Sequence, residues 1–181
     1  MADDFSEDEG RWLTTIEADY SMVGYQAGGL RFVVNRPNAD YFSLYRTPYA
    51  HAILDVDAAN LNGPDNNVMG IVCRFQDINN YYAFILSSDG YYGILSNING
   101  NHQMLPDGQL YFNDDVINTG LSLNHLRVGC VQNALWMEVN GTYLLGLYDS
   151  TLAEGKVGLM AGTLTDPGID ILFDNFSVMQ P

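Results

Sequence analysis

Basic residues are scarce in this 181-residue chain. Seven lysines and arginines stand against 22 acidic residues, Lys156 is the only lysine, and the formal net charge is −15 at pH 7. Nucleic acids and anionic membrane surfaces are bound through a basic face, so the composition argues against both as partners. Neutral sugars and divalent cations are compatible with this charge. Acidity alone also keeps a domain soluble.

Long apolar segments are missing as well. No run approaches the roughly 18–20 residues of a membrane span. The N-terminus, Met-Ala-Asp-Asp-Phe-Ser, has neither the basic region nor the apolar region of a signal peptide. The pattern of a folded domain begins almost at once and continues to Val178. We therefore expect one domain over residues 1–181, cut from a longer exported bacterial protein and located outside the cell or on its surface.

Helical periodicity is nearly absent, whereas turn residues recur about every 8–12 positions, which is typical of an all-β sandwich or barrel. Asp89-Gly90 and Asn140-Gly141 are strong hairpin signals. Between Asn99 and Gly120 we expect mostly loop, with a short strand near Leu110. The expected strands cover residues 29–35, 50–57, 68–75, 80–87, 91–98, 123–131, 134–139, 142–148, 156–162 and 169–178.

Cysteine is limited to Cys73 and Cys130, each in the middle of an expected strand. Their spacing does not match a metal site, and the chain contains no Cys-x-x-Cys. A disulfide between them would close a long loop and contribute about 4 kcal/mol to stability. Two buried free thiols are the alternative, since a free cysteine behaves as a small hydrophobe. The sequence leaves both open.

Six groups of short segments are informative in their order and spacing: residues 70–77 with 79–82, 88–94, 126–130, 139–141, 155–159 and 173–176. Together they resemble the concanavalin A-like lectin/glucanase superfamily. More narrowly, they resemble its laminin-G-like branch and its "domain of unknown function 1080" branch. The resemblance implies a jelly-roll sandwich of two antiparallel sheets with one concave face. Members include glycosidases, sugar-binding modules and domains without known activity, so the fold does not choose the function.

Catalytic motifs are missing. Retaining glycosidases of this superfamily carry a Glu-x-Asp-x-Glu strand, because nucleophile and acid must lie about 5 Å apart. None of the five glutamates belongs to such a motif; they are Glu7, Glu9, Glu17, Glu138 and Glu154. The chain also has no Gly-x-Ser-x-Gly, His-Glu-x-x-His or phosphate-binding loop. We therefore assign no catalytic residue.

Aromatic residues are abundant, with 12 Tyr, 8 Phe and 2 Trp. Sugar rings can stack their C–H faces on aromatic planes. Neighbouring residues of a strand point to opposite faces, so one tyrosine of 81–82 and one of 91–92 must leave the core. We expect a carbohydrate-binding concave surface of Arg74, Tyr82, Tyr92, Trp136 and Glu138. The alternative is that the aromatics complete the sandwich and that Arg74 and Glu138 form a plain ion pair.

The resemblance also implies a structural Ca²⁺ near the chain ends, because jelly-roll modules often hold one there through hard oxygen ligands. Asp4 and Asp174 are the candidate ligands. Together these observations predict a non-catalytic extracytoplasmic domain that binds carbohydrate. A structural or protein-interaction domain of a larger surface protein and a glycoside hydrolase-like enzyme are the two alternatives.

Overall fold

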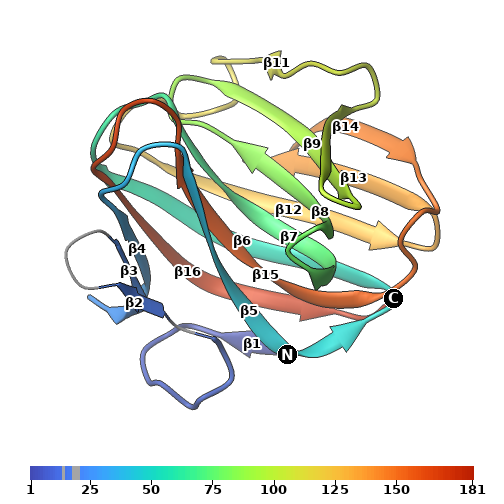
Figure 1. Cartoon of the computed structure of the whole chain (residues 1–181), viewed down its shortest axis with the longest axis horizontal. Coiled ribbons are helices and arrows are strands. Elements are labelled where there is room, and N and C mark those ends of the chain that lie inside the picture. The colour runs from blue at the N-terminus through green and yellow to red at the C-terminus, as the bar shows by residue number, and fades with distance from the viewer. Residues whose placement is uncertain (14, 18–20) are drawn as a thin grey trace.

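Two antiparallel β-sheets stacked face to face form the protein (Figure 1). This computed structural model describes residues 1–13, 15–17 and 21–181, and those residues contain no helix. The nine-stranded sheet has the order β14-β13-β12-β6-β16-β4-β3-β2, with β1 paired to β16. The seven-stranded sheet has the order β10-β9-β8-β7-β15-β5, with β11 paired to β9.

The strands of the nine-stranded sheet are β1 (Ala2–Asp3), β2 (Thr15–Glu17), β3 (Ser21–Gln26), β4 (Gly29–Val34), β6 (Ala52–Asn62), β12 (Leu123–Val131), β13 (Ala134–Val139), β14 (Thr142–Tyr148) and β16 (Ile169–Met179). Those of the seven-stranded sheet are β5 (Ala39–Tyr49), β7 (Asn67–Asp77), β8 (Asn80–Leu86), β9 (Tyr91–Ile98), β10 (Asn101–Leu105), β11 (Tyr111–Phe112) and β15 (Gly155–Thr163).

The chain repeatedly crosses from one sheet to the other. It does so between β4 and β5, between β6 and β7, and again on both sides of β15. As a result β6 lies between β12 and β16, while β7 lies between β8 and β15. The predicted jelly-roll sandwich of two antiparallel sheets is confirmed. In the described part of the chain no helix is long and apolar enough to span a membrane.

Strand prediction succeeded where a hairpin is defined locally. The expected ranges for β12, β13 and β14 match the structure residue by residue. Strands β1, β2, β3, β5 and β10 were not predicted. The edge strand β5 contains Pro48, which weakens a strand pattern and is tolerated at a sheet edge. Strand β10 follows Asn99 and Gly100, whose positive φ angles of 53° and 78° form a tight turn back from β9.

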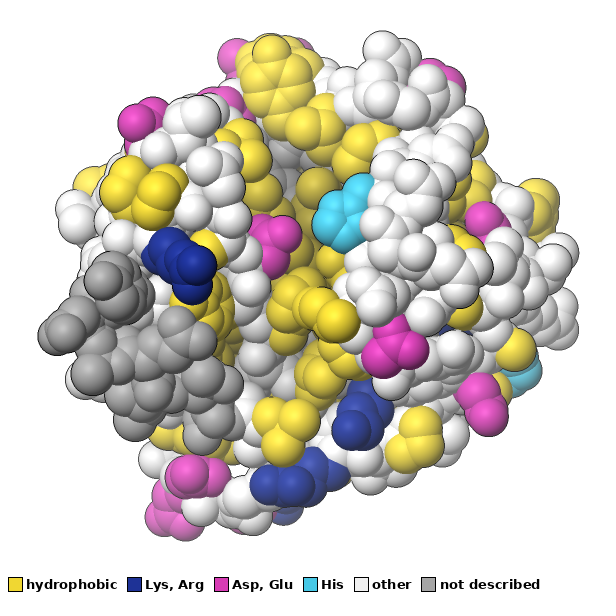
Figure 2. Space-filling view, in the orientation of Figure 1, with side chains coloured by type: hydrophobic (Ala, Val, Ile, Leu, Met, Phe, Trp, Pro, Cys, Tyr) yellow, Lys and Arg dark blue, Asp and Glu magenta, His cyan; other side chains and the backbone are white. Residues whose placement is uncertain are grey.

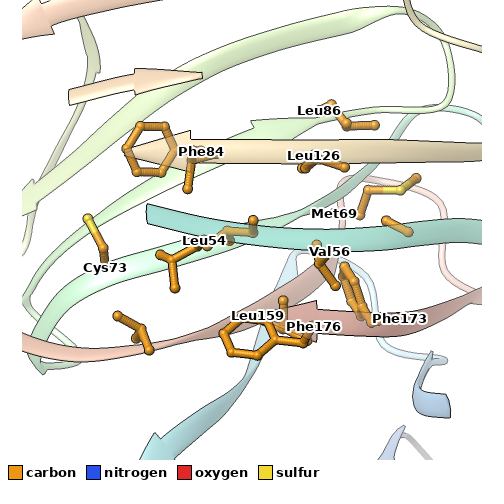
Figure 3. Packing of buried hydrophobic residues seen from close by; sticks show 14 of the residues in the cluster. Leu54, Val56, Met69, Cys73, Phe84, Leu86, Leu126, Leu159, Phe173 and Phe176 are labelled. Carbon is orange, nitrogen blue, oxygen red and sulfur yellow. The ribbon is translucent and has the colours of Figure 1, made fainter. Parts of the chain in front are cut away.

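The core fills the space between the sheets with side chains from both. Leu54 and Val56 of β6 and Leu126 of β12 face Phe84 of β8 and Met69 of β7 (Figure 3). The alternation expected along 50–57 is present, since every second residue of that stretch of β6 is buried. Area removed from water stabilises such a core in proportion to its apolar surface.

A disulfide joins the sheets across this core. Cys73 of β7 and Cys130 of β12 are bonded, with their Cα atoms 6.7 Å apart, and both side chains are buried. The bond therefore links an inner strand of the seven-stranded sheet to an inner strand of the nine-stranded one.

Candidate functional site

The outer face of the seven-stranded sheet is hollowed (Figure 2). Val72, Ala83 and Met160 point away from the main core, yet they are only 0–1% exposed. They belong to a second apolar cluster that lines this hollow, consisting of Leu44, Val72, Tyr81, Ala83, Ile85 and Met160 with Phe42, Val68, Phe75, Leu95 and Met104 packed against them. Because these side chains are buried although they lie on an outer face, neighbouring residues at the margins of the sheet must cover them. The buried side chains form the floor of the hollow. We call this hollow the groove.

Glycine on β9 lets one margin close over the floor. A Cβ at Gly93 would meet the Met104 side chain at 2.5 Å and the Leu110 side chain at 3.0 Å. Because Gly93 has no side chain, Met104 of β10 and Leu110 can fold inward across β9. The wall on this side of the groove depends on that missing side chain.

Three aromatic rings from three different strands gather at one end of the groove. Phe75 of β7 and Tyr81 of β8 are stacked, with centroids 5.5 Å apart and an interplanar angle of 18°. Phe42 of β5 packs edge-on against Tyr81 at 5.3 Å. The ring of His102 on β10 lies 6.4 Å from Tyr81. The three rings provide apolar surface for contact with a ligand, and the Tyr81 hydroxyl adds a polar group beside it.

Polar groups run across the same end. Tyr81, Asn97 and His102 form one cross-strand row over β8, β9 and β10. Asn97 is only 2% exposed, and its Nδ2 donates to Ile78 O at 2.8 Å. Its Oδ1 has no hydrogen-bond partner among the described residues. Most buried polar atoms in proteins are satisfied, so this enclosed oxygen is an exception.

Asp40 reaches into the groove from the opposite edge strand, β5. Its carboxylate lies above Gly162 of β15, where a Cβ would collide with it. The side chain is accessible, but the groove walls displace part of its water, and this desolvation raises the pKa of Asp40 while the charge of His102 lowers it. Burial likewise raises the pKa of Tyr81, an amide hydrogen bond from Asn97 lowers it, and the charge of Asp40 raises it. An acidic group and a histidine thus face each other across the hollow (Figure 2).

The free space in the groove has two connected parts. The part beside Asp40 has a volume of about 250 Å³ and is lined by Asn38, Asp40, Val68, Ile85, Leu95, Met160, Thr163 and Leu164. The second part, about 500 Å³, is mainly apolar and extends toward Tyr91 and Leu110. Both parts share Val68, Ile85 and Leu164. Concave and largely apolar spaces of this size, with a few convergent polar groups, are typical of small-molecule sites.

Arg74 does not line the groove, contrary to the prediction. It sits in a β-bulge with φ +50°, is 1% exposed, and donates to the carbonyl oxygens of Leu152 at 2.8 Å and Gln132 at 2.5 Å. Burial lowers the pKa of its guanidinium. The prediction assumed strict alternation along β7. The extra residue of the bulge breaks that alternation, so Arg74 turns inward and Phe75 turns to the groove.

The tyrosines chosen from the two pairs are also the wrong ones. Tyr82 and Tyr92 are buried in the main core, and the Tyr82 hydroxyl donates to Asp149 at 2.6 Å. Tyr81 faces the groove instead, and Tyr91 is exposed at its apolar end. Alternation requires one tyrosine of each pair to face outward but does not say which.

Trp136 and Glu138 lie on β13 of the other sheet. Their neighbours Leu135, Met137 and Val139 are fully buried, so Trp136 and Glu138 point outward on the opposite side of the sandwich. Glu138 is paired in register with Arg127 and not with Arg74. The prediction of one concave surface formed by all five residues is therefore wrong.

The candidate calcium ligands make separate local contacts. The Asp4 carboxylate accepts hydrogen bonds from the Ser6 backbone and hydroxyl, which lower its pKa. Asp174 lies opposite Asp57 and accepts from the Asn175 amide at 2.6 Å. Within residues 1–13, 15–17 and 21–181, no group of three or more His, Cys, Asp or Glu side chains could hold a metal ion. Since Ca²⁺ takes about 6–8 oxygens, this donor set does not fit, and calcium stays a prediction of the resemblance.

Asp40, Asn97 and His102 were not identified from the sequence as site residues. They lie on β5, β9 and β10, and two of these three strands were not expected. The Asn99-Gly100 pair was a usable hairpin signal for β10. No local pattern indicates that β5 and β10, at opposite edges of the sheet, face each other across one groove.

No protein-family profile matches the sequence, and a search of curated proteins gave no match. Solved structures do match. A carbohydrate-binding module of Bacillus subtilis is 16% identical, with a TM-score of 0.74 over 94% of this chain and 96% of its own. A protein of unknown function with a galectin-like fold, also from Bacillus subtilis, is 12% identical with a TM-score of 0.67, covering 99% and 94%.

An enzyme is among the similar structures too. A xylan β-1,4-xylosidase of Bacillus halodurans is 15% identical with a TM-score of 0.67, and the match covers 99% of this chain but only 39% of the enzyme. At such low identity these comparisons establish the fold alone. The chain is a jelly-roll β-sandwich of the kind found in galectin-like proteins and in a carbohydrate-binding module.

Proposed function

We propose that this protein is a non-catalytic carbohydrate-binding domain and that its ligand lies in the groove, between Asp40 and His102 and over Tyr81. One observation carries this proposal: the Asp40 carboxylate lines a concave space with an apolar floor, and His102 lies near enough for its charge to act on Asp40. A sugar has apolar C–H faces and a rim of hydroxyl groups, so it needs both kinds of surface at once.

The polar side chains of the site can form hydrogen bonds with the hydroxyl groups of a sugar. The Asp40 carboxylate can accept hydrogen bonds from hydroxyl groups. The His102 ring can donate or accept. The aliphatic side chains Val68, Ile85, Leu95 and Met160 supply the apolar contact.

The descriptions of the similar structures also support a role related to sugars. One of them is a carbohydrate-binding module over nearly its whole length, and another is a xylosidase of which this chain matches 39%. Hydrolysis has less support, because a glycosidase needs two carboxyl groups flanking the scissile bond. Asp40 lines one part of the groove and Asp89 lines the other, so no two carboxyl groups line the same part.

We propose that the domain belongs to the concanavalin A-like superfamily, near its laminin-G-like and "domain of unknown function 1080" branches; the similar folds support the superfamily, and the sequence resemblance alone suggests the branches. An exported or cell-surface location agrees with the disulfide between the sheets, since such bonds persist in oxidising compartments.

A glycan and polysaccharide array tests the proposal. Wild-type protein is applied in parallel with Asp40→Asn and His102→Ala. Both residues have accessible side chains, so neither substitution disturbs the core. Asp114→Asn, an exposed aspartate outside the lining of both parts of the groove, serves as the matched control. We expect a reproducible glycan hit that both groove variants lose and the control retains.

A blank array for the wild-type protein would overturn the proposal in favour of a structural or protein-interaction role. A hit that survives both groove substitutions would retain carbohydrate binding but remove it from the groove.

A further inference from the structure

We infer that the domain carries a second carbohydrate-binding surface, an aromatic platform on the nine-stranded sheet formed by Trp136, Tyr143 and Tyr148. It lies on the opposite side of the sandwich from the groove and does not depend on it. Its ligand class is a neutral polysaccharide chain that rests its sugar rings on exposed aromatic faces.

The platform is built around two glycines that flank Trp136 on the neighbouring strands. Gly129 of β12 and Gly146 of β14 are the register partners of Trp136 on either side. A Cβ at Gly129 would collide with the indole ring. The ring therefore lies across β12, over the position of the missing side chain. The indole therefore covers Gly129 on the outer face of the sheet.

Tyrosines on the edge strand β14 extend this surface. Tyr143 and Tyr148 are 61% and 80% exposed, which is unusual for large aromatic side chains. The Tyr143 hydroxyl lies over Gly146, beside the Trp136 side chain. A shallow hollow of about 240 Å³ opens between the rings and is lined by Ala134, Leu135, Trp136, Tyr143, Gly146, Leu147 and Tyr148.

Polar groups flank the rings in the next cross-strand row. Glu138 of β13 is the register partner of Arg127 on β12, and Arg127 in turn donates to Asp55 on β6 at 3.0 Å. The Glu138 carboxylate and the Arg127 guanidinium are within one row of Trp136, where they can bond the hydroxyl groups of a sugar stacked on the indole. Apolar faces and hydrogen-bonding groups again occur together.

A second copy of this chain is a poorer occupant. A stable protein interface buries about 800 Å² on each partner, much more than a shallow hollow and three rings supply. Two copies would also bring together two molecules with a net charge of −15 each. A neutral polysaccharide meets no such repulsion and needs only a few stacking contacts.

The test is a depletion assay with suspensions of amorphous cellulose, chitin and insoluble xylan. The proteins compared are wild type, Trp136→Ala, Tyr148→Ala, Asp40→Asn and the control Leu121→Ala, which removes an exposed apolar side chain elsewhere. We expect Trp136→Ala and Tyr148→Ala each to weaken binding about tenfold on at least one polysaccharide. Leu121→Ala should leave that binding unchanged. Tyr148→Ala cannot unfold the protein, because the ring is almost wholly in solvent.

Unchanged binding in both platform variants would overturn the inference, as would a wild-type protein that binds none of the three polysaccharides. Loss of binding in Asp40→Asn alone would assign the binding to the groove and also overturn it. Light scattering of wild-type protein that shows a dimer, dissociated by Trp136→Ala, would identify the surface as a protein interface.

Discussion

Arg74 is a charged side chain held inside the sandwich by backbone carbonyl groups. Its guanidinium donates to Leu152, Gln132 and Ala50, which belong to three different loops at one end of the molecule. A planar group with five donors can satisfy several carbonyls at once, which a lysine cannot do. Arg74 therefore positions loops and is not a ligand-binding residue.

Replacing Arg74 with alanine should lower the free energy of unfolding by about 3 kcal/mol, because buried carbonyl groups lose their donor. Urea denaturation measures this loss. Arg36→Ala, at an exposed position, is the control and should shift stability by less than about 0.5 kcal/mol. Equal midpoints for the two variants would contradict the structural role of Arg74.

Tyr82 should make stability fall in strongly alkaline solution. Burial and the hydrogen bond to Asp149 raise the pKa of its hydroxyl from 10.0 to about 12. Between these values the unfolded chain binds fewer protons than the folded one, so the free energy of unfolding decreases as pH rises. Its contribution, about 2 kcal/mol, is complete below pH 10 and lost by about pH 12.

Tyr82→Phe should be less stable at neutral pH, since the bond to Asp149 is gone, but its stability should depend less on pH between 10 and 12. Denaturation curves at several pH values measure the slope. Tyr148→Phe, with an exposed ring, provides the comparison. A slope as steep in Tyr82→Phe as in wild type would show that another group causes the alkaline loss.

At the scale of elements, glycines decide how closely strands and side chains approach. The Met104 and Leu110 side chains lie over Gly93, and the Trp136 ring lies over Gly129. Gly70 packs against the backbone of β8. A Cβ at Gly70 would collide with the carbonyl oxygen of Phe84, which cannot rotate away as a side-chain end could. The pairing of β7 with β8 thus requires glycine at position 70.

Gly70→Ala should destabilise the protein by about 2 kcal/mol through this overpacking. Gly24→Ala is the matched control, because it also lies inside a strand but has no atom within 4 Å of the added Cβ. Thermal unfolding should separate the two variants clearly. If both melted like wild type, the close approach of β7 and β8 at Gly70 would be wrong.

At the scale of the whole molecule, the disulfide ties together two sheets whose facing sides pack through apolar side chains. Cys73 and Cys130 are 57 residues apart in sequence, so their bond restricts a large part of the unfolded chain. It also connects the sheet of the groove with the sheet of the aromatic platform.

Cys73→Ala combined with Cys130→Ala should reduce the free energy of unfolding by about 2–4 kcal/mol, in line with loss of a long-range disulfide. Denaturation with and without reductant measures this. Reductant should destabilise the wild-type protein to the level of the double variant and leave that variant unaffected. A fully reduced wild-type protein with unchanged stability would rule out the stabilising role.

Local sequence patterns were enough to predict the fold class and the pairing of strands in several hairpins. These depend on neighbours along the chain: Asn140-Gly141 sets the turn between β13 and β14, and alternation along β6 assigns its core face. The likeness to a jelly-roll sandwich could also be read from short segments, because turns and strand patterns are local.

The positions of the two candidate sites depend on contacts between distant parts of the chain. The bulge at Arg74 changes which residues after Cys73 point inward on β7, and no sequence pattern predicted it. Asp40 and His102 come from opposite edges of one sheet and meet across the groove because the sheet is curved. Trp136 kept its outward orientation but belongs to the other sheet. Alternation tells which residues share a face, whereas curvature and sheet membership depend on contacts between residues far apart in the chain.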